Sequence, residues 1–276
     1  MKNFNLKNKV AIITGSAGFF GPQHAEALLE IGAKVILTDI NKKNLLNTIS
    51  KSKLKKYSRE ILIPLVMDVT SEISIKKVIH TLLKKNIIPD IIINNAAVDP
   101  KVNSNYLTLN GSRLENFSLD QWNHELFVGL TGAFLVSKIF GSTLVNSNKP
   151  GVILNIASDL SVIAPDQRLY QQDGLDFMHQ PVKPVTYSVI KAGLVGLTKY
   201  LSTYWAASNI RCNALSPGGM YFNQSDDFVK KINKLIPMER MARYGEYKAA
   251  IQFLCSDASS YMTGQNIVID GGRSVW

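Results

Sequence analysis

Residues 14–21 read Thr-Gly-Ser-Ala-Gly-Phe-Phe-Gly, and this glycine loop decides the fold that the sequence predicts. An apolar run at 9–13 precedes the loop, and a helical pattern at 22–31 follows it. A strand, a glycine loop and a helix N-terminus form a phosphate cradle, because backbone N–H groups and the helix dipole face the anion. The backbone can approach a pyrophosphate closely at three glycines, Gly15, Gly18 and Gly21. The stretch therefore predicts a dinucleotide-binding site.

Apolar runs typical of strands recur along the chain, with helical patterns between them. They lie at 9–14, 34–40, 61–69, 90–96, 151–158, 210–216 and 266–270. Continuous Val, Ile and Leu indicate strands buried on both faces, as in a parallel sheet, and the helices between them imply right-handed crossovers. We predict an α/β protein with a Rossmann-type, doubly wound parallel sheet of seven strands and helices on both faces. One domain, 1–276, is expected to hold the whole sheet, with ligands at the carboxyl ends of the strands.

The composition is that of an ordinary folded soluble protein. Of 276 residues, 46% are hydrophobic and 19% charged. No continuous apolar run reaches the ~18 residues of a membrane span. The first strand begins within about ten residues of Met1, so we expect no signal peptide. Cys212 and Cys255 fall in a predicted strand and a predicted helix, which favours reduced, buried thiols in the cytoplasm. No Cys/His cluster has metal-ligand spacing, so we expect no metal site. The lack of a long apolar run leads us to expect no membrane partner.

The net charge of +10 gathers around one predicted helix. The residues that carry much of it are Lys42, Lys43, Lys51, Lys53, Lys55, Lys56 and Arg59. A solvated helix face is the simplest interpretation, and a field that attracts anionic substrates is the alternative. The charge comes without a nucleic-acid-binding motif or interleaved aromatic residues, so we expect no nucleic-acid partner.

Asp39 ends the second predicted strand, eighteen residues after Gly21. A carboxylate there accepts hydrogen bonds from the adenosine ribose hydroxyls and repels a 2′-phosphate. No arginine or lysine stands at the nearby positions Ser16, Ala17 or Ile40 to compensate. The sequence therefore predicts NAD rather than NADP, the alternative being that Asp39 caps the next helix.

Two further strand ends complete the predicted cofactor site. Asp68 and Val69 would lie against the adenine, and the run at 94–97, Asn-Asn-Ala-Ala, would line the floor beneath the cofactor. This run is close to the NNAG motif of the classical short-chain dehydrogenases/reductases, and the chain resembles that family. The resemblance assigns cofactor binding to Thr14, Gly15, Gly18, Phe19, Phe20, Gly21, Asp39, Ile40, Asp68, Val69, Asn95, Ala96, Ala97, Tyr187, Lys191, Pro217, Gly218 and Met220.

The glycine spacing itself resembles a different subfamily. The extended members, which act on nucleotide sugars, carry TGxxGxxG, whereas the classical members usually show TGxxxGxG. Two later stretches resemble the classical members: 213–219, whose Pro-Gly turn borders the nicotinamide in that family, and 259–272, which ends in Asp-Gly-Gly. No residues remain for the separate C-terminal domain of the extended members. The chain is thus similar to the classical subfamily, with Phe19 and Phe20 expected to pack on the helix start.

Tyr-x-x-x-Lys occurs twice, as Tyr187 with Lys191 and as Tyr244 with Lys248. The first pair opens a helix and follows a strand that ends in Ser158, whereas no strand near the second pair supplies a serine. Residues at i and i+4 share a helix face. We therefore predict Ser158, Tyr187 and Lys191 as the catalytic residues, and the second pair as part of an ordinary surface helix.

The chemistry of this trio follows from electrostatics. A free tyrosine has a pKa near ~10, so a tyrosine base at pH ~7 needs about ~4 kcal/mol. A cation ~4 Å away at an effective dielectric constant of ~20 supplies about that much, and Lys191 is the cation. Ser158 would hydrogen-bond the substrate oxygen and hold it in line. The resemblance assigns the same three roles.

Three departures from the family pattern bear on function. Gly129 stands where the family has an asparagine that holds a proton-relay water, so either water fills the space or another group, such as Glu125, serves. Met220 follows the Pro-Gly turn where a threonine is usual. The separation of Ser158 from Tyr187, 29 positions, is about twice the family's usual value.

The surplus residues form a loop, 165–184, which we predict to be a substrate lid, the alternative being a disordered insertion. Its polar residues indicate a polyhydroxylated substrate, and the candidate substrate residues are Ser158, Arg168, Tyr170, Asn223 and Gln224. This loop and the 216–224 stretch also resemble oxidoreductases of bacterial surface-sugar and flagellin-glycan pathways.

We predict a cytoplasmic, NAD-dependent oxidoreductase that interconverts a secondary alcohol and a ketone. The alternatives are a 3-oxoacyl-carrier-protein reductase, which would prefer NADPH, and a non-catalytic NAD-sensing scaffold. Small residues on the helices at 118–147 and 187–208 predict a two-fold symmetric homo-oligomer, a tetramer or a dimer.

Overall fold

The structure, a computed structural model, describes residues 2–98 and 111–276. Seven parallel strands form one sheet in the order β3-β2-β1-β4-β5-β6-β7. The strands are β1 (Val10–Ile13), β2 (Lys34–Asp39), β3 (Leu62–Val66), β4 (Ile91–Asn94), β5 (Gly151–Ile156), β6 (Ile210–Pro217) and β7 (Asn266–Ile269). The predicted doubly wound sheet is confirmed, and its order reverses between β1 and β4, where such folds bind their ligands.

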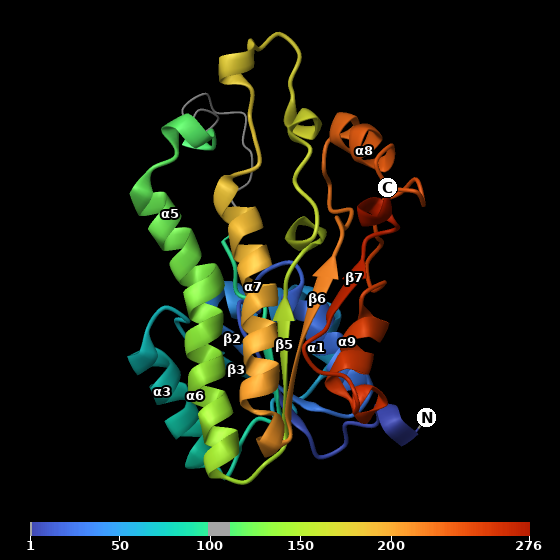
Figure 1. The fold of residues 1–276 in the computed structure, drawn as a ribbon. Coiled ribbons are helices and arrows are strands. Elements are labelled where there is room, and N and C mark those ends of the chain that lie inside the picture. Colours follow the sequence, from blue (N-terminus) through green and yellow to red (C-terminus); the bar gives the residue numbers. More distant parts are fainter. Residues whose placement is uncertain (1, 99–110) are drawn as a thin grey trace.

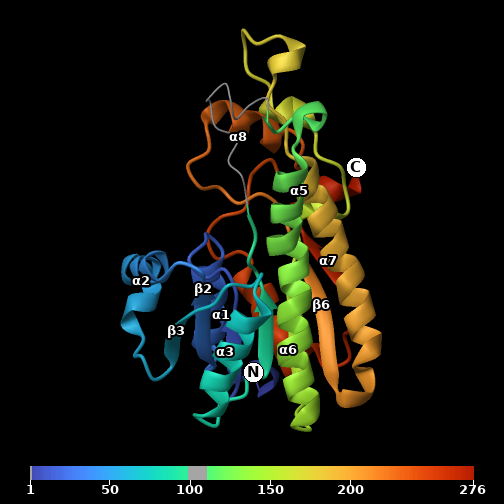
Figure 2. The ribbon, with the colours of Figure 1, turned by 90° about the vertical axis from the view of Figure 1, so that its left-hand side faces the viewer.

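Helices cover both faces of the sheet (Figures 1 and 2). One face carries α1 (Gly21–Glu30), α2 (Lys42–Lys51) and α9 (Lys248–Cys255), and the other carries α3 (Glu72–Leu83), α6 (Gly132–Asn146) and α7 (Val185–Tyr204). Strand side chains alternate between the two cores: Ala11 and Ile13 of β1 lie in the first and Ile12 in the second. The strands are therefore mainly apolar on both faces, as the sequence runs indicated.

The helix expected at 118–147 is interrupted. It consists of α5 (Leu119–Leu126) and α6, joined by a π-helical turn at Phe127–Thr131. The combined helix, Leu119–Asn146, is long and apolar enough to cross a membrane by length and composition, although no unbroken apolar run suggested one. Half of the most apolar 18-residue stretch of this helix is buried inside the protein, which is typical of a core helix.

The basic residues of 42–59 lie exposed on α2 and the turn after it, as expected of a solvated face. The two thiols are buried, Cys212 on β6 and Cys255 on α9. Burial raises the pKa of each to about 12. Both cysteines are therefore unreactive core residues.

The loop at 165–184 rises beyond the carboxyl ends of β5 and β6, beside α8 (Asp226–Asn233) (Figure 1). It contains two short 3-10 turns and no longer element. Leu169 is buried against Ile232, Ile236 and Met241, and Lys231 donates a hydrogen bond to the Gln171 carbonyl at 2.8 Å. The inserted loop is thus packed against α8 at its base.

The outer half of the loop is a hairpin closed by a pair of glutamines. The Gln172 N–H donates to Gln180 Oε1 at 2.8 Å, and Gln180 Nε2 donates to the Gln172 carbonyl at 3.0 Å. Below them, the Lys183 N–H donates to Gln167 Oε1 at 2.8 Å. These bonds hold the two sides of the loop together above the sheet.

Candidate active site

The glycine loop is shaped by crowding at its first and third glycines. A Cβ on Gly15, whose φ is +62°, would lie 2.6 Å from the Cα of Ala96, and a Cβ on Gly21 would lie 2.5 Å from the Ser16 carbonyl oxygen. At Gly18 the nearest atom, the Gly15 oxygen, is 3.3 Å away. The loop is therefore a tight backbone turn in front of α1, which fits a dinucleotide phosphate cradle.

Polar contacts fasten this loop to the end of β4. Thr14 Oγ1 accepts hydrogen bonds from the N–H groups of Asn95 and Ala96, both at 3.0 Å. Asn95 Nδ2 in turn donates to the carbonyls of Thr14 and Gly15 at 2.9 and 3.0 Å. Ala97 follows exposed at the same edge. The stretch predicted to form the cofactor floor thus lies directly beside the glycine loop.

The two loop phenylalanines have different partners. Phe20 stacks on His24 in the first turn of α1, with ring centroids 5.8 Å apart, as the sequence indicated. Phe19 packs edge-on against Phe20, the N-cap residue of α1, with ring centroids 5.2 Å apart. It also reaches Phe222, 4.4 Å away, in the segment that follows β6, a contact that the sequence did not indicate.

Asp39, the residue predicted to bind the adenosine ribose, lies beside the glycine loop. Its Oδ2 accepts the Ala17 N–H at 2.9 Å, and its Oδ1 accepts the Asn41 N–H at 3.0 Å. The cap of α2 is Asn41, whose side chain accepts the Asn44 N–H. Asp39 is thus bound to the glycine loop and is not the helix cap.

The other residues that the sequence predicted to bind the cofactor lie along the same edge of the sheet. Ile40 is exposed, Asp68 accepts bonds from the N–H and hydroxyl of Thr70, and Val69 is buried. Met220 is buried with its sulfur against Gln23 Nε2 of α1 at 3.3 Å. The Gly218 carbonyl, next to Pro217, accepts the Tyr247 hydroxyl at 2.9 Å.

The predicted catalytic residues lie on elements that pack together. Ser158 follows β5 and begins a short turn, Asp159–Ser161, against which α7 packs. On α7, the buried Lys191 donates to the Ile156 carbonyl at 2.8 Å, and its Nζ lies 5.6 Å from the centre of the Tyr187 ring. The structure therefore brings the tyrosine, the lysine and the end of β5 together.

A second cation beside Tyr187 was not foreseen from the sequence. Lys183, at the end of the inserted loop, places its Nζ 3.9 Å from the centre of the Tyr187 ring. Lys183 stands four positions before Tyr187. That spacing indicates a side-chain contact only when both residues belong to one helix, and α7 begins at Val185, after the lysine. The loop thus adds positive charge to the tyrosine that the sequence identified.

The second Tyr-x-x-x-Lys pair is tied to α1. Tyr244 donates to Glu26 Oε2 at 3.0 Å, and Lys248 pairs with Glu26 at 3.4 Å and Glu30 at 2.5 Å. Burial and the bond to Glu26 raise the pKa of Tyr244 to about 12, the opposite of what a base requires. Tyr244 lies in the turn before α9, so the expected surface helix is instead a junction between α9 and α1.

Gly129 lies in the π-helical turn, against α7. A Cβ there would lie 2.8 Å from Ile190 Cγ2, so Ile190 occupies the space that water would fill in the first of the two alternatives. The alternative, Glu125, is buried and accepts hydrogen bonds from Thr186 Oγ1 and from Gln121 Nε2, the latter at 2.9 Å. Since Thr186 precedes Tyr187, Glu125 is the acidic group bonded next to the predicted base.

The candidate substrate residues outside Ser158 belong to two segments. Arg168 is exposed, and its guanidinium donates two hydrogen bonds to Asp166, while Tyr170 packs on Phe228 of α8 with ring centroids 5.8 Å apart. Asn223 is exposed in a left-handed turn, with φ +55°. The amide of Gln224 is engaged within that turn, accepting the Phe222 N–H at 2.6 Å and donating to the Met220 carbonyl at 3.0 Å.

A pocket of about 480 Å³ opens between the inserted loop, residues 112–115 and the start of α7. From α7 it is lined by Val185, Ser188 and Val189, on the helix face away from Tyr187. From the loop it is lined both by the lower part, at Gln167 and Lys183, and by the outer hairpin, at Phe177 and Gln180, whereas Tyr187 is not among its lining residues.

Comparisons with known proteins identify the family. Residues 9–170 match the family model for short chain dehydrogenases, and residues 178–274 match the model described as enoyl-(acyl carrier protein) reductase. The chain belongs to the short-chain dehydrogenase family.

Proteins of this family that are similar in sequence align with nearly the whole chain. An NAD-dependent glycerol dehydrogenase of Listeria innocua is 31% identical, over 99% of this chain and 97% of its own. Post-translational flagellin modification protein A of Campylobacter coli is 29% identical, over 97% of this chain and 98% of its own. The solved structure of a short-chain dehydrogenase from Leptospira borgpetersenii with bound NAD⁺ is 31% identical, with a TM-score of 0.84 over 100% of this chain and 97% of its own. This short-chain dehydrogenase is an oxidoreductase that acts on a CH–OH group.

Proposed function

We propose that this short-chain dehydrogenase uses NAD to oxidise a secondary alcohol of a sugar or another polyhydroxylated small molecule, and reduces the ketone in the reverse direction. The observation that carries the proposal is the Tyr187–Lys191 pair on α7, packed against the end of β5 where Ser158 lies. The glycine loop in front of α1 forms the cofactor cradle at the same edge of the sheet. We take residues 1–276 as one domain with the loop 165–184 inserted.

Each of the three residues has a separate task. When bound, the nicotinamide accepts or supplies the hydride. Tyr187 takes the hydroxyl proton of the alcohol, and Ser158 hydrogen-bonds the same substrate oxygen. Lys191, fixed by its bond to the Ile156 carbonyl, provides the charge that favours the ionised tyrosine. Lys183 above the ring acts in the same direction.

The choice of NAD rests on Asp39. Its carboxylate lies at the glycine loop, bonded to the Ala17 N–H, where the 2′-phosphate of NADP would meet a negative charge. The relatives named above include a glycerol dehydrogenase described as NAD-dependent and a structure with NAD⁺ bound. Both support NAD for this chain.

A polyhydroxylated substrate is supported by the polar residues around the loop and by the likeness to a glycerol dehydrogenase. The likeness to a flagellin modification protein supports a sugar. The second candidate is reduction of a 3-oxoacyl group on a carrier protein, favoured by the match of residues 178–274 to a carrier-protein reductase model. A scaffold that binds NAD without turnover is disfavoured because the serine, tyrosine and lysine are all present.

The test is a turnover screen of the purified protein. NAD and NADP are each offered with polyols, sugars and sugar phosphates, and NADH and NADPH with a 3-oxoacyl thioester. Turnover of a polyol or sugar alcohol with NAD, abolished in Tyr187→Phe, is the expected result. Faster reduction of the thioester with NADPH would replace the proposal by the second candidate, and NAD binding without turnover of any compound would favour the scaffold.

We also propose that the chain forms a two-fold symmetric homo-oligomer, a tetramer or a dimer, in the cytoplasm. The outer faces of α6 and α7 expose large apolar residues that a partner copy would cover, namely Phe134, Tyr200 and Tyr204. The two buried thiols fit a reducing compartment. Light scattering at micromolar concentration measures the assembly, and a monomer would contradict it.

A further inference from the structure

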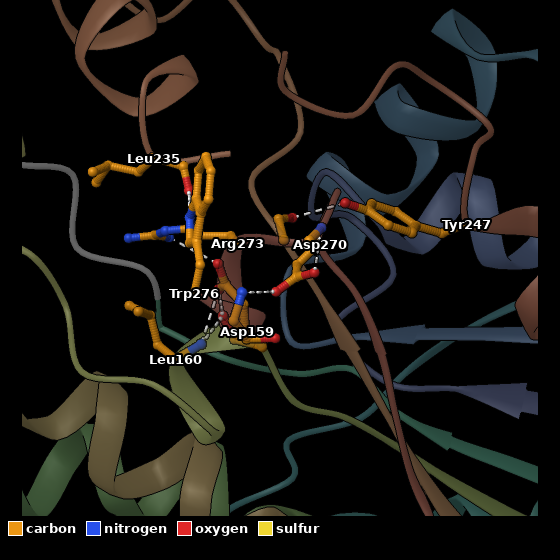
Figure 3. Close-up of polar contacts among 11 residues, drawn as sticks. Asp159, Leu160, Leu235, Tyr247, Asp270, Arg273 and Trp276 are labelled. Atoms are coloured by element: carbon orange, nitrogen blue, oxygen red, sulfur yellow. Dashed lines mark hydrogen bonds and ion pairs between the residues drawn. The ribbon is translucent and has the colours of Figure 1, made fainter. Parts of the chain in front are cut away.

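A buried ion pair joins the C-terminal segment to the turn that carries Ser158. Arg273 Nη1 lies 2.8 Å from Asp159 Oδ2, and the two side chains are 8% and 4% exposed. The residues are 114 positions apart in the sequence. Figure 3 shows the guanidinium and the carboxylate pointing toward one another. A pair so deeply buried requires good geometry, because desolvation of both charges opposes it.

The other oxygen of the same carboxylate holds the serine. Ser158 Oγ lies 2.8 Å from Asp159 Oδ1, which also accepts the Leu160 N–H at 2.9 Å. A carboxylate paired with a guanidinium has no hydrogen to give, so the hydroxyl is the donor. Oγ also accepts the Leu160 N–H at 3.2 Å. The oxygen of Ser158 is thus held by two hydrogen bonds, one to the Asp159 carboxylate and one from the Leu160 N–H. The Arg273 guanidinium in turn holds the Asp159 carboxylate.

Arg273 is itself held by a tight turn. Asp270 accepts the N–H groups of Gly272 and Ser274 at 2.9 and 2.8 Å. A side chain at Gly271, whose φ is +69°, would place its Cβ 2.7 Å from Ile236 Cγ2. Farther on, Trp276 Nε1 donates to the Leu235 carbonyl at 3.1 Å (Figure 3). The geometry of residues 270–276 therefore sets where the guanidinium lies.

We propose that Arg273 is a positioning residue that, through Asp159, holds the side chain of Ser158 in place for the reaction, so that the C-terminal turn belongs to the active site. Ser158 has one hydroxyl hydrogen, which it donates to Asp159 before substrate binds and turns to the substrate oxygen when substrate is present. This inference rests on the proposed function. Without the guanidinium, a buried carboxylate would remain beside the serine with no counter-charge. It would draw in water or a proton, and the serine oxygen would lose its fixed place.

A double-mutant cycle distinguishes positioning from a general loss of stability. We expect Arg273→Met to lower kcat by at least tenfold, while the Kd for NAD changes less than twofold. In a Ser158→Ala background, Arg273→Met should cause little further loss of kcat, because the group through which it acts is gone. A full additional tenfold loss in that background would overturn the proposal.

Arg211→Met is the matched control. Arg211 is also partly buried and donates to the carbonyls of Met262, Leu254 and Ser256, away from the serine. Arg211→Met should lower the Tm but leave kcat unchanged. If Arg273→Met fails to fold, Asp159→Asn, which keeps the shape and removes the charge, enters the same cycle with the same expected outcomes.

The cycle also separates this inference from the proposed function. If Ser158→Ala and Tyr187→Phe leave turnover unchanged, the proposed function fails. If both impair turnover and Arg273→Met does not, only the positioning role fails.

Discussion

The hydroxyl of Tyr244 donates a hydrogen bond to the carboxylate of Glu26, at 3.0 Å, and this contact removes one of the two Tyr-x-x-x-Lys pairs from the search for a base. Glu26 is buried on α1, and its neighbours Lys53 and Lys248 are also paired with it. Tyr244 is therefore a structural donor, and its pKa, raised to about 12, keeps its proton in place.

The two tyrosines should respond differently to loss of the hydroxyl. We expect Tyr187→Phe to lower turnover by at least ~10²-fold, the usual contribution of general acid–base catalysis, with little change in NAD binding. Tyr244→Phe should leave kcat unchanged and reduce the free energy of unfolding by about 1–2 kcal/mol, since it removes a bond to a carboxylate. Steady-state kinetics and denaturant unfolding measure both. Comparable losses of turnover would show that the wrong pair was chosen.

Cofactor choice is expected to depend on Asp39. NAD should bind at least tenfold more tightly than NADP, because an unfavourable charge contact of ~1.4 kcal/mol already gives that factor. Asp39→Ala should narrow the difference, mainly by improving NADP binding. Calorimetric titration of both cofactors checks this, and equal affinities in the unmodified protein would contradict it.

Gly15→Ala should weaken both the cofactor site and the fold. The new methyl would meet the Cα of Ala96 at 2.6 Å, on a backbone whose φ is +62°. We expect a loss of NAD affinity of tenfold or more and a lower Tm. Gly196→Ala is the matched control, because a Cβ on that helical glycine meets nothing within 4 Å. It should leave NAD binding intact.

The outer hairpin of the inserted loop is expected to serve the substrate and not the cofactor. Replacing residues 173–179 by a short glycine linker keeps Leu169 in its cluster and keeps the closing pair of Gln172 and Gln180. The KM for the substrate should rise sharply, while the Kd for NAD should change little, because lids exclude water and contact substrate. An unchanged kcat/KM would place specificity elsewhere.

His24 should make stability fall in mild acid. Burial lowers its pKa from 6.5 to about 4, an effect that the nearby Asn95 side chain partly offsets. The unfolded chain therefore takes up a proton below pH 6.5 that the folded protein refuses, so stability present above pH 6.5 is lost as the pH falls toward 4. Between pH 6.5 and 5 the loss should be on the order of 2 kcal/mol.

Urea unfolding at several pH values measures the slope of the free energy of unfolding against pH. His24→Gln should flatten it, because no imidazole remains to titrate. The carboxylates Glu72 and Glu246, whose pKa values are lowered to about 2 by bonds to Lys138 and Arg240, begin to act only below about pH 4.5. A slope that persists in His24→Gln between pH 6.5 and 5 would exclude His24 as its source.

The sequence by itself determined the strands and the glycine loop, and it predicted Tyr187 over Tyr244 as the base. These are local signals: apolar runs bury strands on both faces, and glycines at fixed spacing open a turn before a helix. The positions of Asp39 at the end of a strand and of Lys191 one helical turn after Tyr187 also followed from the sequence, because both depend on local spacing alone.

Only the tertiary structure decided the contacts between distant segments. Ile190 fills the space beside Gly129, where the sequence had left water or another group as alternatives, and the Gln224 amide is bonded within its own loop. Arg273 reaches Asp159 across 114 positions, and neither residue carries a local pattern that names the other. Such pairs follow from the order of strands in the sheet, which brings the end of β7 to the end of β5 across β6, and local sequence periodicity does not encode that order.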